Sequence, residues 1–130
     1  MSIKLIRIAI VFGLVAIILG AFGAHALKAV LTEQQLISFE TGVRYQIYQA
    51  LFLLFIGSTN LLTDKIKKIV SVFLILGVLF FSGSIYLLST QDLTGVNFKF
   101  LGPITPIGGF LIMISWLIVA VKLTKQKTNN

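Results

Sequence analysis

Four long apolar segments, separated by short polar linkers, dominate the 130 residues of this chain. A helix needs about 20 mostly apolar residues to cross about 30 Å of hydrocarbon, and all four segments are close to that length. Hydrophobic residues make up 57% of the chain, against about 45–50% in soluble domains, so a bilayer suits it better than water. We therefore expect an all-α fold, an integral membrane four-transmembrane-helix bundle that forms a single domain over residues 1-130. The expected helices are about 8-27, 42-62, 69-89 and 105-123.

The Lys and Arg residues are divided unevenly between the two sides of this bundle. In a four-span chain the N-terminus, the middle linker and the C-terminus share one side, which carries eight of the eleven basic residues. Because short loops rich in Lys and Arg remain in the cytoplasm, we expect both termini to be cytoplasmic. The basic residues lie between and beyond the apolar segments, not in one patch with aromatic residues, so no nucleic acid partner is expected. The eight are Lys4, Arg7, Lys65, Lys67, Lys68, Lys122, Lys125 and Lys127.

The first apolar segment has two interpretations. Lys4 and Arg7, followed by an apolar stretch and Ala24-His25-Ala26, resemble a signal peptide with its cleavage site. Against this, small residues recur along the segment at alternating spacings of four and three, which is typical of close helix packing. We favour a retained helix, because a discarded peptide has no need of such a stripe. The expected packing residues are Gly13, Ala16, Gly20 and Gly23, with Gly77 in the third helix.

The linker after the first segment contains a helix-start signal. Thr32, followed three residues later by Gln35, is a capping-box pattern. Leu36, Ile37 and Phe39 then alternate with polar residues, which predicts a short interfacial helix on the outer side between helices 1 and 2. The sequence leaves open whether this helix continues into helix 2.

Polar side chains share one face of the second helix. Amides in hydrocarbon need hydrogen-bond partners, so we expect them to face neighbouring helices. Arg44 lies on the opposite face near the outer end, where it could extend to the headgroups or bind a lipid phosphate or another anion. The shared face consists of Gly42, Gln46, Gln49, Leu53, Ile56 and Asn60, with Tyr45 at its edge.

Thr105 directly before Pro106 predicts the start of the fourth helix. A threonine hydroxyl can accept an unpaired amide as N-cap, and proline is favoured at the first helical position because it has no amide to leave unpaired. The preceding residues 101-104 would then be non-helical. We expect them to fold over the outer mouth of the bundle, since irregular backbone at membrane depth must be covered.

The titratable residues limit the chemistry that this chain can perform. It has no Cys and a single histidine, His25, so we expect no metal, haem or other cofactor. All four acidic residues lie in loops or at interfaces, whereas a proton-coupled exporter needs one near mid-membrane. No catalytic triad, carboxylate pair or phosphate-binding loop can be assembled at depth, so we do not expect an enzyme.

Four motifs occur in chain order: Leu19-Gly20-Ala21-Phe22-Gly23-Ala24-His25, Thr41-Gly42 with Tyr45-Gln46, Phe81-Ser82-Gly83-Ser84 with Tyr86, and Thr105-Pro106-Ile107-Gly108-Gly109 followed by Trp116. Together they resemble the YgdD/YwdK-type family of small multi-pass membrane proteins, an uncharacterised protein family with a domain of unknown function. The resemblance covers nearly the whole chain and implies a bacterial cell membrane protein, with relatives in eukaryotes and no established activity. The chain departs from the pattern at Gln49, where many members carry a second histidine, and at Ser115, which replaces a glycine.

All four motifs fall in the outer half of the expected bundle. We therefore hypothesise a shallow outward-facing pocket, in which free amides of residues 107-109 at a helix N-terminus meet an anionic lipid or a small anion. The alternative is a polar layer that only caps and holds the bundle together. The candidate pocket residues are His25, Arg44, Tyr45, Gln46, Gln49, Ser82, Ser84, Tyr86, Thr105, Gly108 and Gly109.

Two classes of function fit this pattern. The first is a structural, lipid-interacting or accessory membrane protein, with membrane lipids as partners and self-association into a homo-oligomer through its small-residue faces. The alternative is an oligomeric small-solute or ion permease, with Gln46, Gln49 and Ser84 along its path. Transport into liposomes distinguishes the two.

Overall fold

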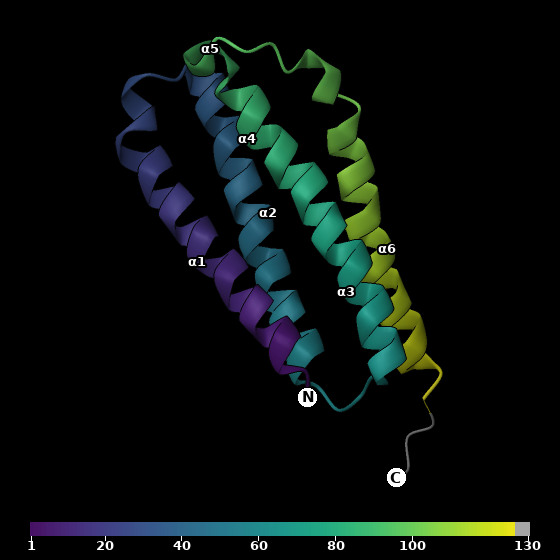
Figure 1. Cartoon of the computed structure of the whole chain (residues 1–130). Coiled ribbons are helices and arrows are strands. Elements are labelled where there is room, and N and C mark those ends of the chain that lie inside the picture. Colours follow the sequence, from purple (N-terminus) through teal and green to yellow (C-terminus); the bar gives the residue numbers. More distant parts are fainter. Residues whose placement is uncertain (127–130) are drawn as a thin grey trace.

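The computed structural model describes residues 1–126, and every regular element within them is helical. Four long helical rods lie side by side and are joined by short connections (Figure 1). The third rod consists of α3, η2 and α4 in succession. In chain order the elements are α1 (Ile3–His25), η1 (Leu27–Ala29), α2 (Glu33–Ser58), α3 (Asp64–Val78), η2 (Leu79–Gly83), α4 (Ser84–Ser89), α5 (Gln91–Thr94), η3 (Lys99–Leu101) and α6 (Ile104–Thr124).

Three segments in residues 1–126 are long and apolar enough to cross a membrane: Ile3–Ala29, Asp64–Ser89 and Lys99–Thr124. The remaining rod, α2, is just as long, with 26 residues, but it carries Arg44, Gln46 and Gln49 near its middle. The chain is therefore a helical membrane protein with three apolar spans and one long helix of mixed polarity.

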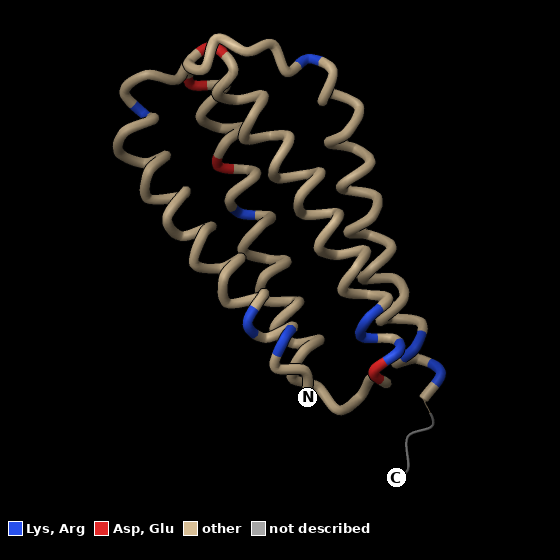
Figure 2. The backbone as a smooth tube through the Cα atoms, in the orientation of Figure 1, with Lys and Arg blue, Asp and Glu red and all other residues tan. Residues whose placement is uncertain are grey.

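The two ends of the bundle differ in charge (Figure 2). One end, which we call the basic end, holds the N-terminus, the turn at residues 59–63 and the last turn of α6, and blue Lys and Arg positions gather there. The opposite end, which we call the far end, holds the connections at residues 26–32 and 90–103. Glu33 and Asp92 lie at the far end, whereas Asp64 is the acidic residue of the basic end.

The start of α2 is set by side-chain hydrogen bonds. The capping box predicted at Thr32 and Gln35 is confirmed, because the backbone amide of each residue donates to the side-chain oxygen of the other, at 3.0 and 3.2 Å. The sequence left open whether the expected interfacial helix continues into helix 2, and it does, because the cap opens one continuous helix to Ser58. Gly42 does not interrupt it. A Cβ there would lie 2.8 Å from the ring of Tyr86, so this glycine allows close packing and does not act as a hinge.

The predicted start of the fourth helix is wrong by two residues. α6 begins at Ile104, after Pro103, so Thr105 and Pro106 lie inside its first turn. Proline is tolerated there because the first amides of a helix have no intrahelical acceptor. Thr105 is not the cap, since its hydroxyl pairs with Ser84 at 2.5 Å.

The third rod contains a π turn, η2, that the sequence did not predict. It widens the helix between Val78 and Ser84, where a regular helix was expected over 69-89. The backbone of α6 lies directly against this turn, because a Cβ built on Gly108 would overlap the backbone nitrogen of Phe81. π turns inside helices occur where packing or function demands a local change of geometry. Here the turn coincides with the closest approach between α6 and the third rod.

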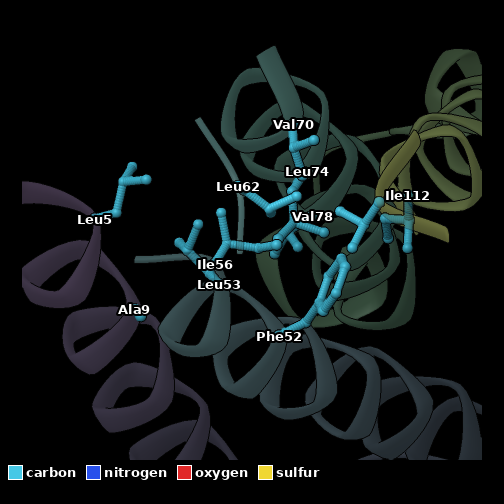
Figure 3. Close-up of a cluster of buried hydrophobic side chains, with 11 residues drawn as sticks. Leu5, Ala9, Phe52, Leu53, Ile56, Leu62, Val70, Leu74, Val78 and Ile112 are labelled. Carbon is cyan, nitrogen blue, oxygen red and sulfur yellow. The ribbon is translucent and has the colours of Figure 1, made fainter. Parts of the chain in front are cut away.

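The rods pack as two pairs, α1 along α2 and α3 along α6, and α2 joins the pairs through its contacts with α3 and α4. The small-residue stripe expected on α1 faces α2, where a Cβ on Gly20 would lie 3.2 Å from Val43 and one on Gly23 would lie 3.0 Å from Phe39. The core toward the basic end combines all four rods (Figure 3), and its most deeply buried members come from α2 and α3. These members are Leu53, Ile56, Val70 and Leu74.

Candidate functional site

Polar side chains from α2, η2, α4 and α6 gather around the middle of the bundle and toward its far end. Most of them are buried or half-buried members of the expected pocket, and Trp116 completes the set by its contact with one of these. We call this set the polar layer. It consists of Gln46, Gln49, Ser82, Ser84, Tyr86, Thr105 and Trp116.

Gln46 joins three helices through one side chain. Its Nε2 donates to the carbonyl oxygen of Phe12 in α1 at 2.9 Å. Its Oε1 accepts the hydroxyl of Tyr86 in α4 at 2.6 Å. Only 6% of Gln46 is exposed, so both bonds are shielded from competing water. This amide fixes α1 and α4 relative to α2.

Ser82 and Ser84 connect the third rod to two different neighbours. Residues two apart on a helix point in roughly opposite directions. Ser82 accordingly donates to the carbonyl oxygen of Gly42 in α2 at 2.7 Å. Ser84 donates to the carbonyl oxygen of Phe81 at 3.0 Å, so in its 2.5 Å contact with Thr105 of α6 the threonine is the donor. The π turn and the start of α4 are thus held from both sides.

Gln49 and Trp116 link α2 directly to α6. The indole Nε1 of Trp116 donates to Oε1 of Gln49 at 2.7 Å. The indole also stacks on Phe52 with 3.8 Å between centroids and 16° between planes. Gln49 is buried, whereas Trp116 is 47% exposed on the outside of the bundle. The pair combines an apolar stack with one hydrogen bond to an otherwise buried amide.

The candidate pocket residues do not all come together. His25 is the last residue of α1 and is exposed. Arg44 is also exposed and donates to Thr41 of its own helix at 3.4 Å. Tyr45 packs on Phe81 at the bundle surface, with 5.1 Å between ring centroids. The single outward pocket that would contain all eleven residues is therefore not formed.

The backbone amides proposed to bind an anion at the start of α6 are instead hydrogen-bonded within the helix. Because α6 begins at Ile104, the amides of Gly108 and Gly109 have regular intrahelical acceptors four residues earlier. Gly108 is buried against η2, and Gly109 lies beside the ring of Phe81. Their role in this structure is helix packing.

Two residues of interest were not predicted as site residues from the sequence. Trp116 stood out only as part of a family motif, although a tryptophan in mid-span, away from the interfaces that it prefers, signals a need for an indole partner. In the sequence, Lys67 was interpreted only as one of the positive charges on the cytoplasmic side, whereas in the structure it is 3% exposed. Its proximity to the apolar segment that follows was the available signal.

A cavity of about 280 Å³ touches the polar layer between α1 and the third rod. Gln46, Ser82 and Tyr86 line it, but their polar atoms are engaged in the hydrogen bonds described above. Within residues 1–126 no three His, Cys, Asp or Glu side chains are grouped as metal ligands.

Comparison with known proteins identifies relatives over most of the chain. The family model described as "Protein of unknown function (DUF423)" matches residues 19–109. The UPF0382 membrane protein YwdK of Bacillus subtilis is 38% identical over 117 residues, which are 86% of this chain and 89% of the relative. A UPF0382 membrane protein of Haemophilus influenzae is 30% identical over 98% of this chain and 99% of its own length. The UPF0382 inner membrane protein YgdD of Escherichia coli is 32% identical over 92% and 88%. No solved structure matches the chain.

Proposed function

The chain belongs to the DUF423 family, which includes the UPF0382 membrane proteins, and we propose that it is a non-catalytic, four-span protein of the bacterial cell membrane with a structural, lipid-interacting or accessory role. In this proposal the polar layer locks the four rods together at a fixed spacing. The protein then presents a rigid, apolar outer surface to lipid or to other copies of itself.

The observation that carries this proposal is the internal pairing of the polar layer. Within residues 1–126, no buried side-chain nitrogen or oxygen lacks a hydrogen-bond partner. A permease needs polar groups that can exchange their partners for a solute, whereas Gln46, Gln49 and Ser84 are each committed to groups on other elements or on the backbone. Paired groups of this kind stabilise a bundle in hydrocarbon.

The four-span topology makes a prediction for reporter fusions. α2 has 26 residues, about 39 Å at the usual rise, and it buries Gln46 and Gln49 against its neighbours, which supports a role as the fourth span. Fusions of a compartment-sensitive reporter at Lys65 and at Lys125 should both report the cytoplasm, because both positions lie at the basic end. A fusion at Val96, in the far-end connection, should report the opposite side. A non-cytoplasmic signal at Lys65 or Lys125 would contradict this topology.

The structural role makes a second prediction, for transport. Purified protein reconstituted into liposomes should release or take up protons, potassium, chloride and glycerol no faster than protein-free liposomes do. A pore-forming peptide added to the same vesicles is the positive control. If the protein does give flux, and Gln49→Ala or Ser84→Ala reduces it while Gln34→Ala does not, the permease alternative is correct. Gln34 is a suitable control because it is exposed at the start of α2.

A further inference from the structure

Lys67 is a buried cation at the basic end of the bundle. It lies in the first turn of α3 and is 3% exposed, whereas the neighbouring Lys65 and Lys68 are both exposed. Its Nζ donates to the carbonyl oxygen of Gly57 at 3.5 Å, but that oxygen already accepts the amide of Ser2 at 2.7 Å. An ammonium group has three donors, and a buried charge is stable only when an opposite charge and good hydrogen bonds accompany it. Lys67 is therefore poorly satisfied by its protein neighbours.

A cavity of about 560 Å³ lies beside Lys67, between the start of α1 as far as Ile8 and α3 as far as Ile75. Lys4 and Lys68 line it as well, so the lining has three basic side chains and one carboxylate, that of Asp64. Asp64 is exposed and lies in the first turn of α3, where the helix dipole already stabilises it. The lining as a whole has a positive excess and suits an anionic group.

The apolar wall of this cavity continues toward the far end along the same two rods. Ile8 of α1 and Ile75 of α3 line the cavity beside Lys67, and one turn further Phe12 and Val78 line the second cavity of about 280 Å³. Both cavities lie between α1 and the third rod, and we call the two together the groove. A charged mouth followed by an apolar groove matches a molecule with an anionic head and a hydrocarbon chain.

We propose that this groove binds one anionic phospholipid, with its phosphate between Lys67, Lys4 and Lys68 and one acyl chain between α1 and the third rod. The phosphate supplies charged acceptors for the Lys67 ammonium, whose acceptor within residues 1–126 is the carbonyl oxygen of Gly57 that it shares with Ser2. A free phosphate ion would satisfy the cations but leave the apolar groove unused, which is why the lipid is the better occupant. Anionic lipids are attracted to basic segments at the membrane surface, and the basic end carries such segments. This site rests on the proposed membrane role.

Lipid retention in native mass spectrometry tests the site. The protein, purified in a mild detergent, is incubated with phosphatidylglycerol or with phosphatidylcholine of the same chain length. Lys67→Met should retain phosphatidylglycerol about tenfold less than the parent protein, the effect of one lost charge-assisted hydrogen bond. Lys65→Met is the matched control, because it removes the same charge from an exposed side chain two residues away. It should retain phosphatidylglycerol like the parent protein. Equal retention by Lys67→Met and the parent would overturn the proposal.

Two further measurements distinguish a specific lipid site from non-specific attraction and from a free-anion site. Lys4→Gln should lower phosphatidylglycerol retention severalfold, whereas Arg7→Gln, exposed on the same helix outside the lining, should not, and equal effects would mean non-specific attraction. Excess inorganic phosphate should leave the lipid bound. If phosphate displaces the lipid, the site binds a free anion and the lipid proposal is wrong.

The stability of Lys67→Met without lipid provides the remaining control. Its thermal midpoint in lipid-free detergent should equal or exceed that of the parent, because the variant no longer carries the unfavourable desolvation free energy of a poorly paired buried charge. A lower midpoint with unchanged lipid retention would show that Lys67 only caps the end of α2. Retention and liposome flux are separate readouts, so failure of the lipid site and failure of the structural role can be distinguished.

Discussion

Gly108→Ala is expected to destabilise the bundle by about 3 kcal/mol or more, at or above the upper end of the usual range for overpacking. The added Cβ would overlap the backbone nitrogen of Phe81 and would lie 2.7 Å from the carbonyl carbon of Phe80 and 2.8 Å from the carbonyl oxygen of Gly77. These are backbone atoms, so no side-chain rotation can relieve the clash, and α6 must move away from η2. Reversible unfolding in mixed micelles, followed by fluorescence of the single tryptophan, Trp116, measures the effect at the α2–α6 contact.

Gly109→Ala is the matched control for this change. A Cβ on Gly109 would lie 3.5 and 3.7 Å from ring atoms of Phe81, which is ordinary van der Waals contact. Alanine is also a better helix former than glycine by about 1 kcal/mol. This variant should therefore be as stable as the parent or slightly more stable. If the two alanine variants unfold at the same midpoint, α6 does not approach η2 as closely as the structure has it.

The sequence predicted the rods well but not their ends. Apolar length locates the middle of a helix, whereas its ends are set by local hydrogen bonds that apolar length does not detect. α1 starts at Ile3 because Ser2 caps it, which places Lys4 and Arg7 within the helix and outside the predicted apolar range. α2 starts at Glu33 for the same kind of reason, and the capping box that marks it was visible in the sequence.

The polar face of α2 was predictable because it depends on one helix alone. Gln46 and Gln49 lie on the expected face and are buried, whereas Asn60 lies in the exposed turn after α2 has ended. Their partners were not predictable. Trp116 is 67 residues from Gln49, and only the packing of α6 beside α2 brings the two together. The burial of Lys67 likewise depends on how the first turns of α1 and α3 meet the end of α2.

The π turn shows why a periodicity argument was insufficient at the candidate site. A regular helix over 69-89 would keep one register throughout, but η2 changes that register between Val78 and Ser84. Ser82 then reaches α2 and Ser84 reaches α6, while Gly108 fits against the widened turn. Gly77, Ser82, Gly83 and Ser84 are compatible with this geometry, but small residues alone do not distinguish a π turn from a regular helix.

Gln46→Met is expected to destabilise the bundle by about 1–3 kcal/mol, because it leaves the hydroxyl of Tyr86 without its acceptor in a shielded site. Methionine has a similar length and no branch, so it can occupy the same space. Tyr86→Phe should have a smaller effect, about 1 kcal/mol, since Nε2 of Gln46 still donates to Phe12. Unfolding in mixed micelles measures both variants, with Gln34→Met and Tyr48→Phe as exposed controls that should be nearly neutral.

The double variant, Gln46→Met with Tyr86→Phe, tests whether the hydrogen bond between these two side chains of the polar layer stabilises the bundle. If the two side chains bond to each other, the loss in the double variant should be smaller than the sum of the single losses by about 0.6–1.7 kcal/mol, from the average to the maximum coupling found for such pairs in membranes. Additive losses would mean that the 2.6 Å contact contributes nothing to stability. A measured coupling would show that this bond between α2 and α4 stabilises the folded bundle. A structural role requires such a stabilising bond, whereas polar groups that exchange their partners along a solute path would show little coupling.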